Sequence, residues 1–128
     1  MKTIVIFDPD PDLLEMICLA LEMQGFIAIG LHNLNADLME LIEHHEPDLI
    51  LLDFAYAGKF CIEWCRHIKR FYPTLPVIAI SCNNNIGETY NGHGFDDCIC
   101  KPFDLAHLYA TADRYTNLLY HTDGADNF

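Results

Sequence analysis

Four polar side chains in this sequence could together bind and accept a phosphoryl group. They are Asp8, Asp53, Ser81 and Lys101, and each directly follows a segment expected to form a strand. In open α/β sheets, ligands bind at the edge where the carboxyl ends of the strands meet. Phosphoryl transfer to a carboxylate needs a nucleophile, an acid that holds Mg²⁺, and two groups that bind the transferred oxygens. We therefore expect these four residues to form one site.

Asp53 is the strongest candidate among them for a nucleophile or a metal ligand. It follows Leu49–Leu52, a four-residue apolar run without alternation, which is typical of a central parallel strand covered on both faces. Taken singly, each of the four also has a purely structural interpretation, as a helix cap, a loop acid, a turn hydroxyl or a surface ammonium. Their joint placement at strand ends favours the functional interpretation.

The pattern along the chain predicts five strands that alternate with helices. The first helix is capped by Asp10, has Pro11 at its first position and ends at Gly25. Such alternation with right-handed crossovers predicts an α/β fold, a doubly wound parallel sheet with helices on both faces. Residues 83–94 are rich in asparagine and glycine, so any helix there is expected to be short. Strands are expected at residues 4–7, 26–29, 49–52, 77–80 and 97–100, and further helices at about 34–45, 59–71 and 104–119. The last helix is expected to face the core with Leu105, Leu108, Ala112, Tyr115 and Leu119.

Composition and charge argue against several classes of protein. With 128 residues, the chain is expected to form one domain over residues 1–120, followed by a disordered tail at 121–128. Seven basic residues against 19 acidic ones give a net charge of −12, which argues against binding to nucleic acid or to an anionic membrane. No apolar run approaches the roughly 18 residues of a membrane span and no signal-peptide pattern is present, so a cytoplasmic location is expected. The six cysteines are then expected to be reduced and to serve as small buried side chains.

The four polar residues and the strands that precede them resemble the receiver domain of two-component response regulators. The resemblance extends from residue 2 to about residue 120. Its most specific part is the pair formed by the aspartate after a buried strand and the lysine-proline-phenylalanine sequence. The resemblance rests on Ile4–Asp8 with Pro11–Asp12, on Pro47–Asp53 with Gly58, on Ser81, on Gly94–Asp97 and on Lys101–Phe103.

The resemblance implies a flavodoxin-like, five-stranded sheet with the strand order 2-1-3-4-5. It also implies a phosphoprotein of signal transduction, in which Asp53 becomes an aspartyl phosphate by accepting a phosphoryl group from a histidine kinase or phosphotransfer protein in a phosphorelay. Lys101 would pair with that group, and Ser81 would donate a hydrogen bond to it. The implied cofactor is Mg²⁺, held by Asp8, Asp53 and the backbone carbonyl of Ala55. Such a domain is not an enzyme, beyond phosphorylating and dephosphorylating itself.

With no output domain in this sequence, a single-domain regulator that signals by docking to a protein target is expected. In the family, the surface made by the fourth helix, the fifth strand and the fifth helix changes on phosphorylation. Here that surface corresponds to Asn83–Gly94, Cys98–Cys100 and Asp104–Tyr120. The sequence identifies neither the kinase nor the target.

The sequence departs from the family pattern close to the expected site. Pro9 stands where the family usually has a second acid, so Mg²⁺ binding is expected to be weak. Asp10 is a candidate to replace that acid, although its role as a helix cap competes for the same oxygens. Cys98 replaces the aromatic residue of the family's hydroxyl-to-aromatic switch, which cannot operate here in its usual form. In addition, Cys82 replaces a small residue and Ala57 replaces a proline.

Two other classes of function stay open from the sequence. The first is a pseudo-receiver that binds a partner without being phosphorylated. The second is a phosphatase of the haloacid dehalogenase type, because an apolar strand followed by Asp8-Pro9-Asp10 is similar to the nucleophile motif of those enzymes. In that case Asp8 is the nucleophile and Asp10 the general acid. Asp12 in place of the usual threonine, the lack of an acidic pair after the lysine, and a chain too short for a cap domain argue against a phosphatase.

Overall fold

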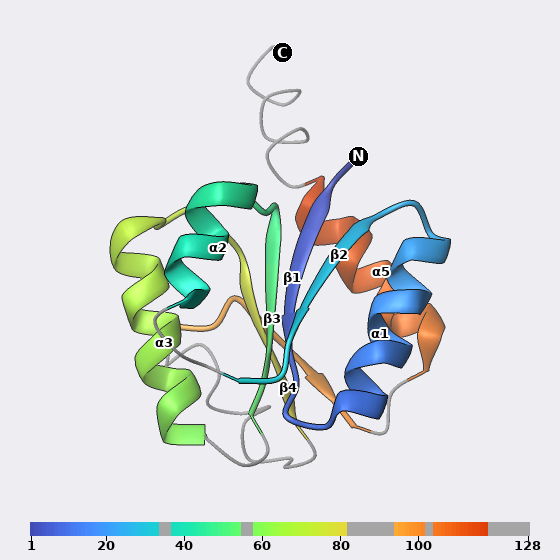
Figure 1. The fold of residues 1–128 in the computed structure, drawn as a ribbon, viewed down its shortest axis with the longest axis horizontal. Helices are drawn as coiled ribbons and strands as arrows, with labels where there is room; N and C mark the ends of the chain where they lie inside the picture. Colours follow the sequence, from blue (N-terminus) through green and yellow to red (C-terminus); the bar gives the residue numbers. More distant parts are fainter. Residues whose placement is uncertain (34–36, 55–57, 82–93, 102–103, 118–128) are drawn as a thin grey trace.

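A parallel sheet of five strands lies between two layers of helices in the computed structural model of the chain (Figure 1). The structure describes residues 1–33, 37–54, 58–81, 94–101 and 104–117. The strand order is β2-β1-β3-β4-β5, which confirms the predicted doubly wound α/β fold. The elements are, in chain order, β1 (Thr3–Phe7), α1 (Pro11–Met23), β2 (Ile27–Leu31), α2 (Asp37–His45), β3 (Leu49–Asp53), α3 (Gly58–Phe71), β4 (Val77–Ser81), β5 (Asp97–Cys100) and α5 (Leu105–Thr116).

The three central strands are buried along their whole length. Every residue of β1, β3 and β4 is buried. Within the sheet, β1 lies between β2 and β3, with Val5 opposite Ile29 on one side and Ile50 on the other. Because helices cover both faces, side chains that point either way meet apolar neighbours, which explains the apolar runs without alternation. Full burial of one Leu or Ile side chain stabilises a fold by about 1.5–3 kcal/mol, so these strands hold their carboxyl ends firmly in place.

Each face of the sheet packs against its own pair of helices. Helices α1 and α5 cover one face, and α2 and α3 cover the other (Figure 1). Within the described part of the chain, no helix is both long enough and apolar enough to cross a membrane. The buried sheet residues on the α1 and α5 side are Ile4, Ile6, Leu49, Leu51, Ile78, Ile80 and Ile99, and those on the α2 and α3 side are Val5, Phe7, Ile50, Leu52, Val77 and Ala79.

Helix α1 begins and ends as the sequence predicts. The Asp10 side chain accepts hydrogen bonds from the backbone N–H groups of Asp12 and Leu13, at 3.0 and 3.3 Å. Pro11 occupies the first helical position, where its missing N–H costs no hydrogen bond. After the helix, Gly25 has a φ of +92°, a conformation that glycine adopts without steric cost. The strong N-terminal cap fixes where α1 starts relative to the end of β1.

Three expectations about the elements are wrong in detail. Strand β2 lies one to two residues later than the predicted 26–29, because its pairing with β1 starts at Ile27. The sequence places Leu105 in the core, but it is 44% exposed because it is the first residue of α5. The sequence also predicts a buried Cys100, which is exposed at the end of the edge strand β5. Cys18 and Cys98 are half-buried, whereas Cys61 and Cys65 are buried as predicted. The expected helix near residues 83–94 falls, apart from Gly94, outside the described residues, as do the tail at 121–128, Leu34 and Leu119.

Candidate functional site

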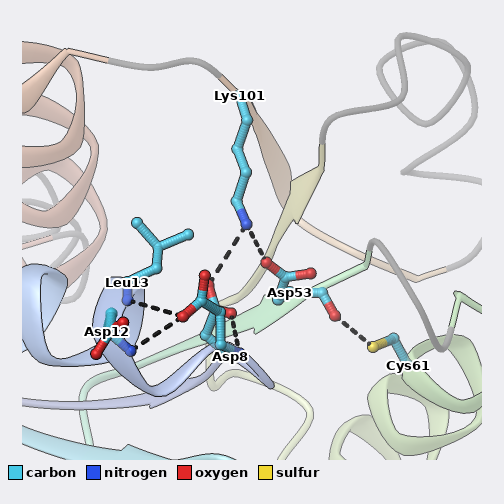
Figure 2. Close-up of polar contacts among 7 residues, drawn as sticks. Asp8, Asp12, Leu13, Asp53, Cys61 and Lys101 are labelled. Carbon is cyan, nitrogen blue, oxygen red and sulfur yellow. Dashed lines mark hydrogen bonds and ion pairs between the residues drawn. The ribbon is translucent and has the colours of Figure 1, made fainter.

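Two carboxylates and one ammonium meet at the carboxyl edge of the sheet (Figure 2). Asp8 directly follows β1, Asp53 is the last residue of β3, and Lys101 directly follows β5. Both carboxylates are only 1% exposed. Lys101 Nζ forms an ion pair with Asp53 Oδ2 and lies 3.4 Å from Asp8 Oδ2. The structure thus brings together three of the four residues that the sequence singles out.

The register of the sheet explains why these side chains meet. β1 and β3 are direct neighbours, with Phe7 opposite Leu52, so the residues that follow this pair lie side by side. The sheet pattern continues past the strand ends, because the Lys101 N–H donates to the Ser81 carbonyl at 2.7 Å. In the same way, the Asp8 N–H donates to the carbonyl at the end of β2, at 3.0 Å. The positions of Asp8 and Lys101 are therefore fixed by backbone hydrogen bonds that continue the sheet.

The electrostatics of the site favour a bound cation. The pKa of Asp8 is raised, chiefly because burial disfavours its charged form and also because Asp53 repels it. The backbone N–H of Asp10, which donates to Asp8 Oδ1 at 2.9 Å, and the Lys101 ammonium act in the opposite direction. For Lys101, burial acts to lower the pKa, but its bonds and attraction to Asp53 and Asp8 outweigh burial and raise it. One ammonium thus faces two carboxylates, which leaves an excess of negative charge when both are ionised.

Ser81 is also at this edge of the sheet, as the sequence predicts. It is the last residue of β4 and is buried. Its neighbour Ile80 pairs with Asp53 in the register between β3 and β4, and Ser81 itself pairs with Cys100. A hydroxyl is therefore carried by the strand that lies between those of Asp53 and Lys101.

Asp10, the candidate replacement for the missing second acid, is exposed and serves as the cap of α1. Asp10 Oδ1 accepts hydrogen bonds from the backbone N–H groups of Asp12 and Leu13. The backbone N–H of Asp10 donates to Asp8 and so orients its carboxylate. Pro9 lies between the two acids and offers no side-chain oxygen. Ala55, whose carbonyl is an expected metal ligand, lies outside the described residues.

Mg²⁺, which the family resemblance implies, fits the donors that are described. It prefers oxygen ligands and is commonly held by one or two carboxylates with water completing its shell. Asp8 and Asp53 provide two such carboxylates in a negatively charged, buried setting. No group of three or more His, Cys, Asp or Glu side chains that could hold a metal is found among the described residues. A two-carboxylate donor set of this kind depends on backbone carbonyls or water for its other ligands.

Cys61 contributes to the site in a way that sequence reasoning misses. Its Sγ donates a hydrogen bond to the backbone carbonyl of Asp53 at 2.9 Å (Figure 2). Burial, together with the nearby charges of Asp53 and Cys65, raises the pKa of Cys61 to about 12, so the thiol keeps its proton and stays a donor. The only signal in the sequence is its place on the inner stripe of α3, which predicts burial but no hydrogen bond. Cys61 therefore ties the start of α3 to the peptide group that carries the nucleophile candidate.

The chain is similar in sequence to known response regulators. The chain matches the response regulator receiver domain family over residues 4–113. It is 36% identical over 113 residues to the phosphate regulon transcriptional regulatory protein PhoB of Pseudomonas aeruginosa, covering 85% of this chain and 49% of that protein. It is 33% identical over 112 residues to the nisin biosynthesis regulatory protein NisR of Lactococcus lactis, covering 86% of this chain and 48% of that protein. The chain spans about half the length of the curated relatives it matches.

Solved structures share the fold. A response regulator from Thermotoga maritima has a TM-score of 0.80 at 22% identity, over 91% of this chain and 98% of that chain. NtrX from Brucella abortus, in complex with ADP, has a TM-score of 0.83 at 24% identity, over 99% of this chain and 29% of that chain. The response regulator TrrA from Thermotoga maritima, in complex with Mg²⁺ and BeF, has a TM-score of 0.79 at 18% identity, over 90% and 99% of the two chains. With the family match covering most of its length, this chain belongs to the receiver domain family of two-component response regulators.

Proposed function

We propose that this receiver domain accepts a phosphoryl group on the Asp53 carboxylate from a histidine kinase or histidine phosphotransfer protein. The observation that supports this most strongly is the Lys101 ammonium, which pairs with Asp53 and lies close to Asp8 at the carboxyl edge of the sheet. A buried carboxylate that already has a cationic partner can exchange that contact for one between the cation and an incoming phosphoryl group. Asp53 is therefore the acceptor, and Lys101 is the group that binds the transferred oxygens.

The transfer itself needs little covalent chemistry from the protein. A carboxylate oxygen of Asp53 forms a bond to phosphorus while the bond from phosphorus to the donor's imidazole nitrogen breaks, and the electron pair of that bond stays on the imidazole. Lys101 neutralises charge on the phosphoryl oxygens, and the Ser81 hydroxyl donates a hydrogen bond to one of them. Asp8 would contribute its carboxylate to the metal site. Asp8, Asp53 and Ser81 are buried at the ends of rigid strands, which keeps them in place without reorganisation.

In this proposal Asp8, Asp53 and the backbone carbonyl of Ala55 would hold Mg²⁺. When bound, it supplies positive charge that offsets the two carboxylates and the phosphoryl oxygens. The affinity is weak because Pro9 provides no carboxylate and Asp10 is occupied as a helix cap. The raised pKa of Asp8 supports this assignment, since it reflects a cost of burying negative charge that a divalent cation relieves.

Replacing Asp10 by alanine is expected to destabilise the fold by about 1 kcal/mol while leaving Mg²⁺ affinity nearly unchanged. The variant loses the two cap hydrogen bonds but keeps the backbone N–H that orients Asp8. Urea unfolding measures the first effect and calorimetric titration with Mg²⁺ the second. Asp10→Asn keeps the cap and removes the charge, so it serves as the matched control. A large loss of Mg²⁺ affinity in Asp10→Asn would identify Asp10 as a metal ligand and contradict the proposal.

The phosphorylated domain signals by docking to a downstream protein through the surface that includes Cys98–Cys100 and α5. Cys98 is half-buried against the core on the α3 side and is much shorter than an aromatic side chain. It therefore cannot move between inward and outward positions as a tyrosine does. The parts of this surface at residues 82–93 and 118–120 lie outside the described residues.

Replacing Cys98 by alanine is accordingly expected to leave the phosphorylation-dependent change in partner binding nearly intact. The check is partner affinity of the Cys98→Ala variant, measured with and without acetyl phosphate and compared with the unmodified chain. Loss of most of the phosphorylation-dependent change would show that Cys98 transmits the signal.

Incubation with acetyl phosphate and Mg²⁺ tests the proposed function directly. Intact-mass measurement is expected to show the addition of one phosphoryl group per chain. The second candidate function, a partner-binding module that is not phosphorylated, is favoured by one observation, the proline in place of the second acid. An unmodified mass after prolonged incubation, in a protein that still binds its partner, would decide for that candidate.

A further inference from the structure

Strand β5 presents two thiols on the same face, next to the candidate site. Cys98 and Cys100 are two residues apart on the strand, so their side chains point the same way. Their Sγ atoms lie 4.0 Å apart. Cys98 is half-buried and Cys100 is exposed, so solvent reaches the pair. Neither thiol has a role in the proposed phosphoryl transfer.

The spacing of the two sulfurs suits a shared metal ion better than a disulfide. A disulfide requires the sulfurs to be about 2.05 Å apart, which would force β5 to contract. An ion held about 2.3 Å from each sulfur, as zinc is by cysteine, allows the sulfurs to lie up to about 4.6 Å apart. The observed 4.0 Å therefore accepts an ion between the sulfurs with little movement of the strand.

We propose that Cys98 and Cys100 bind a soft monovalent cation of the Cu(I) type. Thiolates select Cu(I), zinc and iron–sulfur clusters among the common metals. Structural zinc sites take four ligands and iron–sulfur clusters are likewise held by four residues. In the described part of the chain no third His, Cys, Asp or Glu joins these two thiols to complete a metal site. Two sulfur ligands are sufficient for Cu(I), which is stable with a coordination number of two.

The neighbouring acid does not complete a site of another kind. Asp97 accepts a hydrogen bond from the Cys98 N–H at 2.7 Å and another from the Tyr115 hydroxyl at 2.9 Å. Its carboxylate is thus engaged with α5, on the opposite side of the strand from the thiols. Among the described residues the pair thus has a sulfur-only donor set, which disfavours hard cations such as Mg²⁺.

Binding replaces protons by metal. Burial, together with the proximity of Cys100 and Asp97, raises the pKa of Cys98 to about 12, so the Cys98 thiol keeps its proton at neutral pH until a metal replaces it. On binding, both S–H bonds break, two S–Cu bonds form and two protons go to the solvent, with no change in the oxidation state of sulfur or copper. Lys101 immediately follows Cys100, so an occupied pair would lie one residue from the ammonium that contacts Asp53.

A competition titration under anaerobic, reducing conditions tests the proposal. Cu(I) is added to the full chain in the presence of the chromogenic chelator bicinchoninate, without Mg²⁺ and without a phosphodonor. We expect one Cu(I) per chain to be withdrawn from the chelator. Loss of an outer-sphere partner of a metal typically costs 10- to 100-fold in affinity, so the loss of one of two direct ligands is expected to cost about 100-fold or more in Cys98→Ser and in Cys100→Ser.

Cys18→Ser is the matched control, because Cys18 is also half-buried but packs against the core on the α1 side of the sheet. Its copper affinity is expected to equal that of the unmodified chain. Thermal unfolding of each copper-free variant establishes that it is folded. If Cys98→Ser does not fold, Cys98→Ala takes its place. Undiminished binding in a folded Cys98 or Cys100 variant, or loss of binding in Cys18→Ser, would overturn the proposal. Since no phosphoryl transfer is involved, this outcome is independent of the proposed function.

Discussion

Asp53→Asn is expected to abolish phosphorylation by acetyl phosphate, whereas Asp8→Asn is expected only to slow it. An amide oxygen at residue 53 cannot act as the nucleophile, so no acyl phosphate can form there. Asp8 contributes through the metal and the local charge, and its loss leaves the acceptor and Lys101 in place. Intact-mass measurement over a time course with acetyl phosphate and Mg²⁺ gives both results.

The same pair of variants separates the receiver from a phosphatase of the haloacid dehalogenase type. If the phosphoryl group persists in Asp53→Asn but is lost in Asp8→Asn, then Asp8 is the nucleophile and the proposed function is wrong. Removing one partner of a buried ion pair typically destabilises a protein by about 3–5 kcal/mol, so each variant must first be shown to be folded by circular dichroism. The Asn side chain keeps the size of Asp, which limits any effect of packing.

Pro9→Asp is expected to tighten Mg²⁺ binding by about 10-fold or more and to speed phosphorylation of Asp53. The substitution restores a carboxylate at a position that directly follows Asp8, where the family usually places a metal ligand. Loss of an outer-sphere partner alone weakens metal binding by roughly 10- to 100-fold, so the gain of a direct carboxylate is expected to have at least the smaller of these effects. Without metal, a third carboxylate near a single ammonium is expected to lower stability through repulsion.

Calorimetric titration with Mg²⁺, run beside Pro9→Asn, isolates the effect of the added charge. The asparagine variant also removes the proline ring, but it brings no carboxylate. Equal Mg²⁺ affinity in the unmodified chain and in Pro9→Asp would mean that another group, with Asp10 the nearest acid in sequence, already fills the position. The account of a weakened metal site would then be wrong.

Much of the fold could be predicted from the sequence because its central strands are unusually easy to recognise. Leu49–Leu52 and its counterparts are short, continuous apolar runs, and only strands covered on both faces explain them. The order of the strands followed from the family resemblance, since periodicity carries no information on which strands pair. The bounds of β2 could not be predicted as well, because this edge strand is only half-buried and its limits depend on its register with β1.

The site was predictable in its residue types but not in its contacts. A polar residue directly after a buried strand indicates a functional edge, and this pattern alone points to Asp8, Asp53 and Lys101. The choice between two roles for Asp10 depended on which hydrogen bonds its carboxylate makes, and both roles use the same sequence pattern. Cys61 could not be found because a cysteine on the inner face of a helix predicts packing, whether or not its thiol donates a hydrogen bond.

The strand order also decides when, during synthesis, the charges of the site can be balanced. The strands that end in the two carboxylates lie side by side and come from the first half of the chain. Their shared ammonium follows β5, the last strand, at the edge of the sheet. A growing chain, which emerges with its amino terminus first, thus holds both carboxylates before their counter-ion exists. Burying two carboxylates together without a cation is costly. We therefore expect this edge of the nascent sheet to stay open to water until β5 adds Lys101. The carboxyl end of β1 can thus be buried only after β5 has been synthesised.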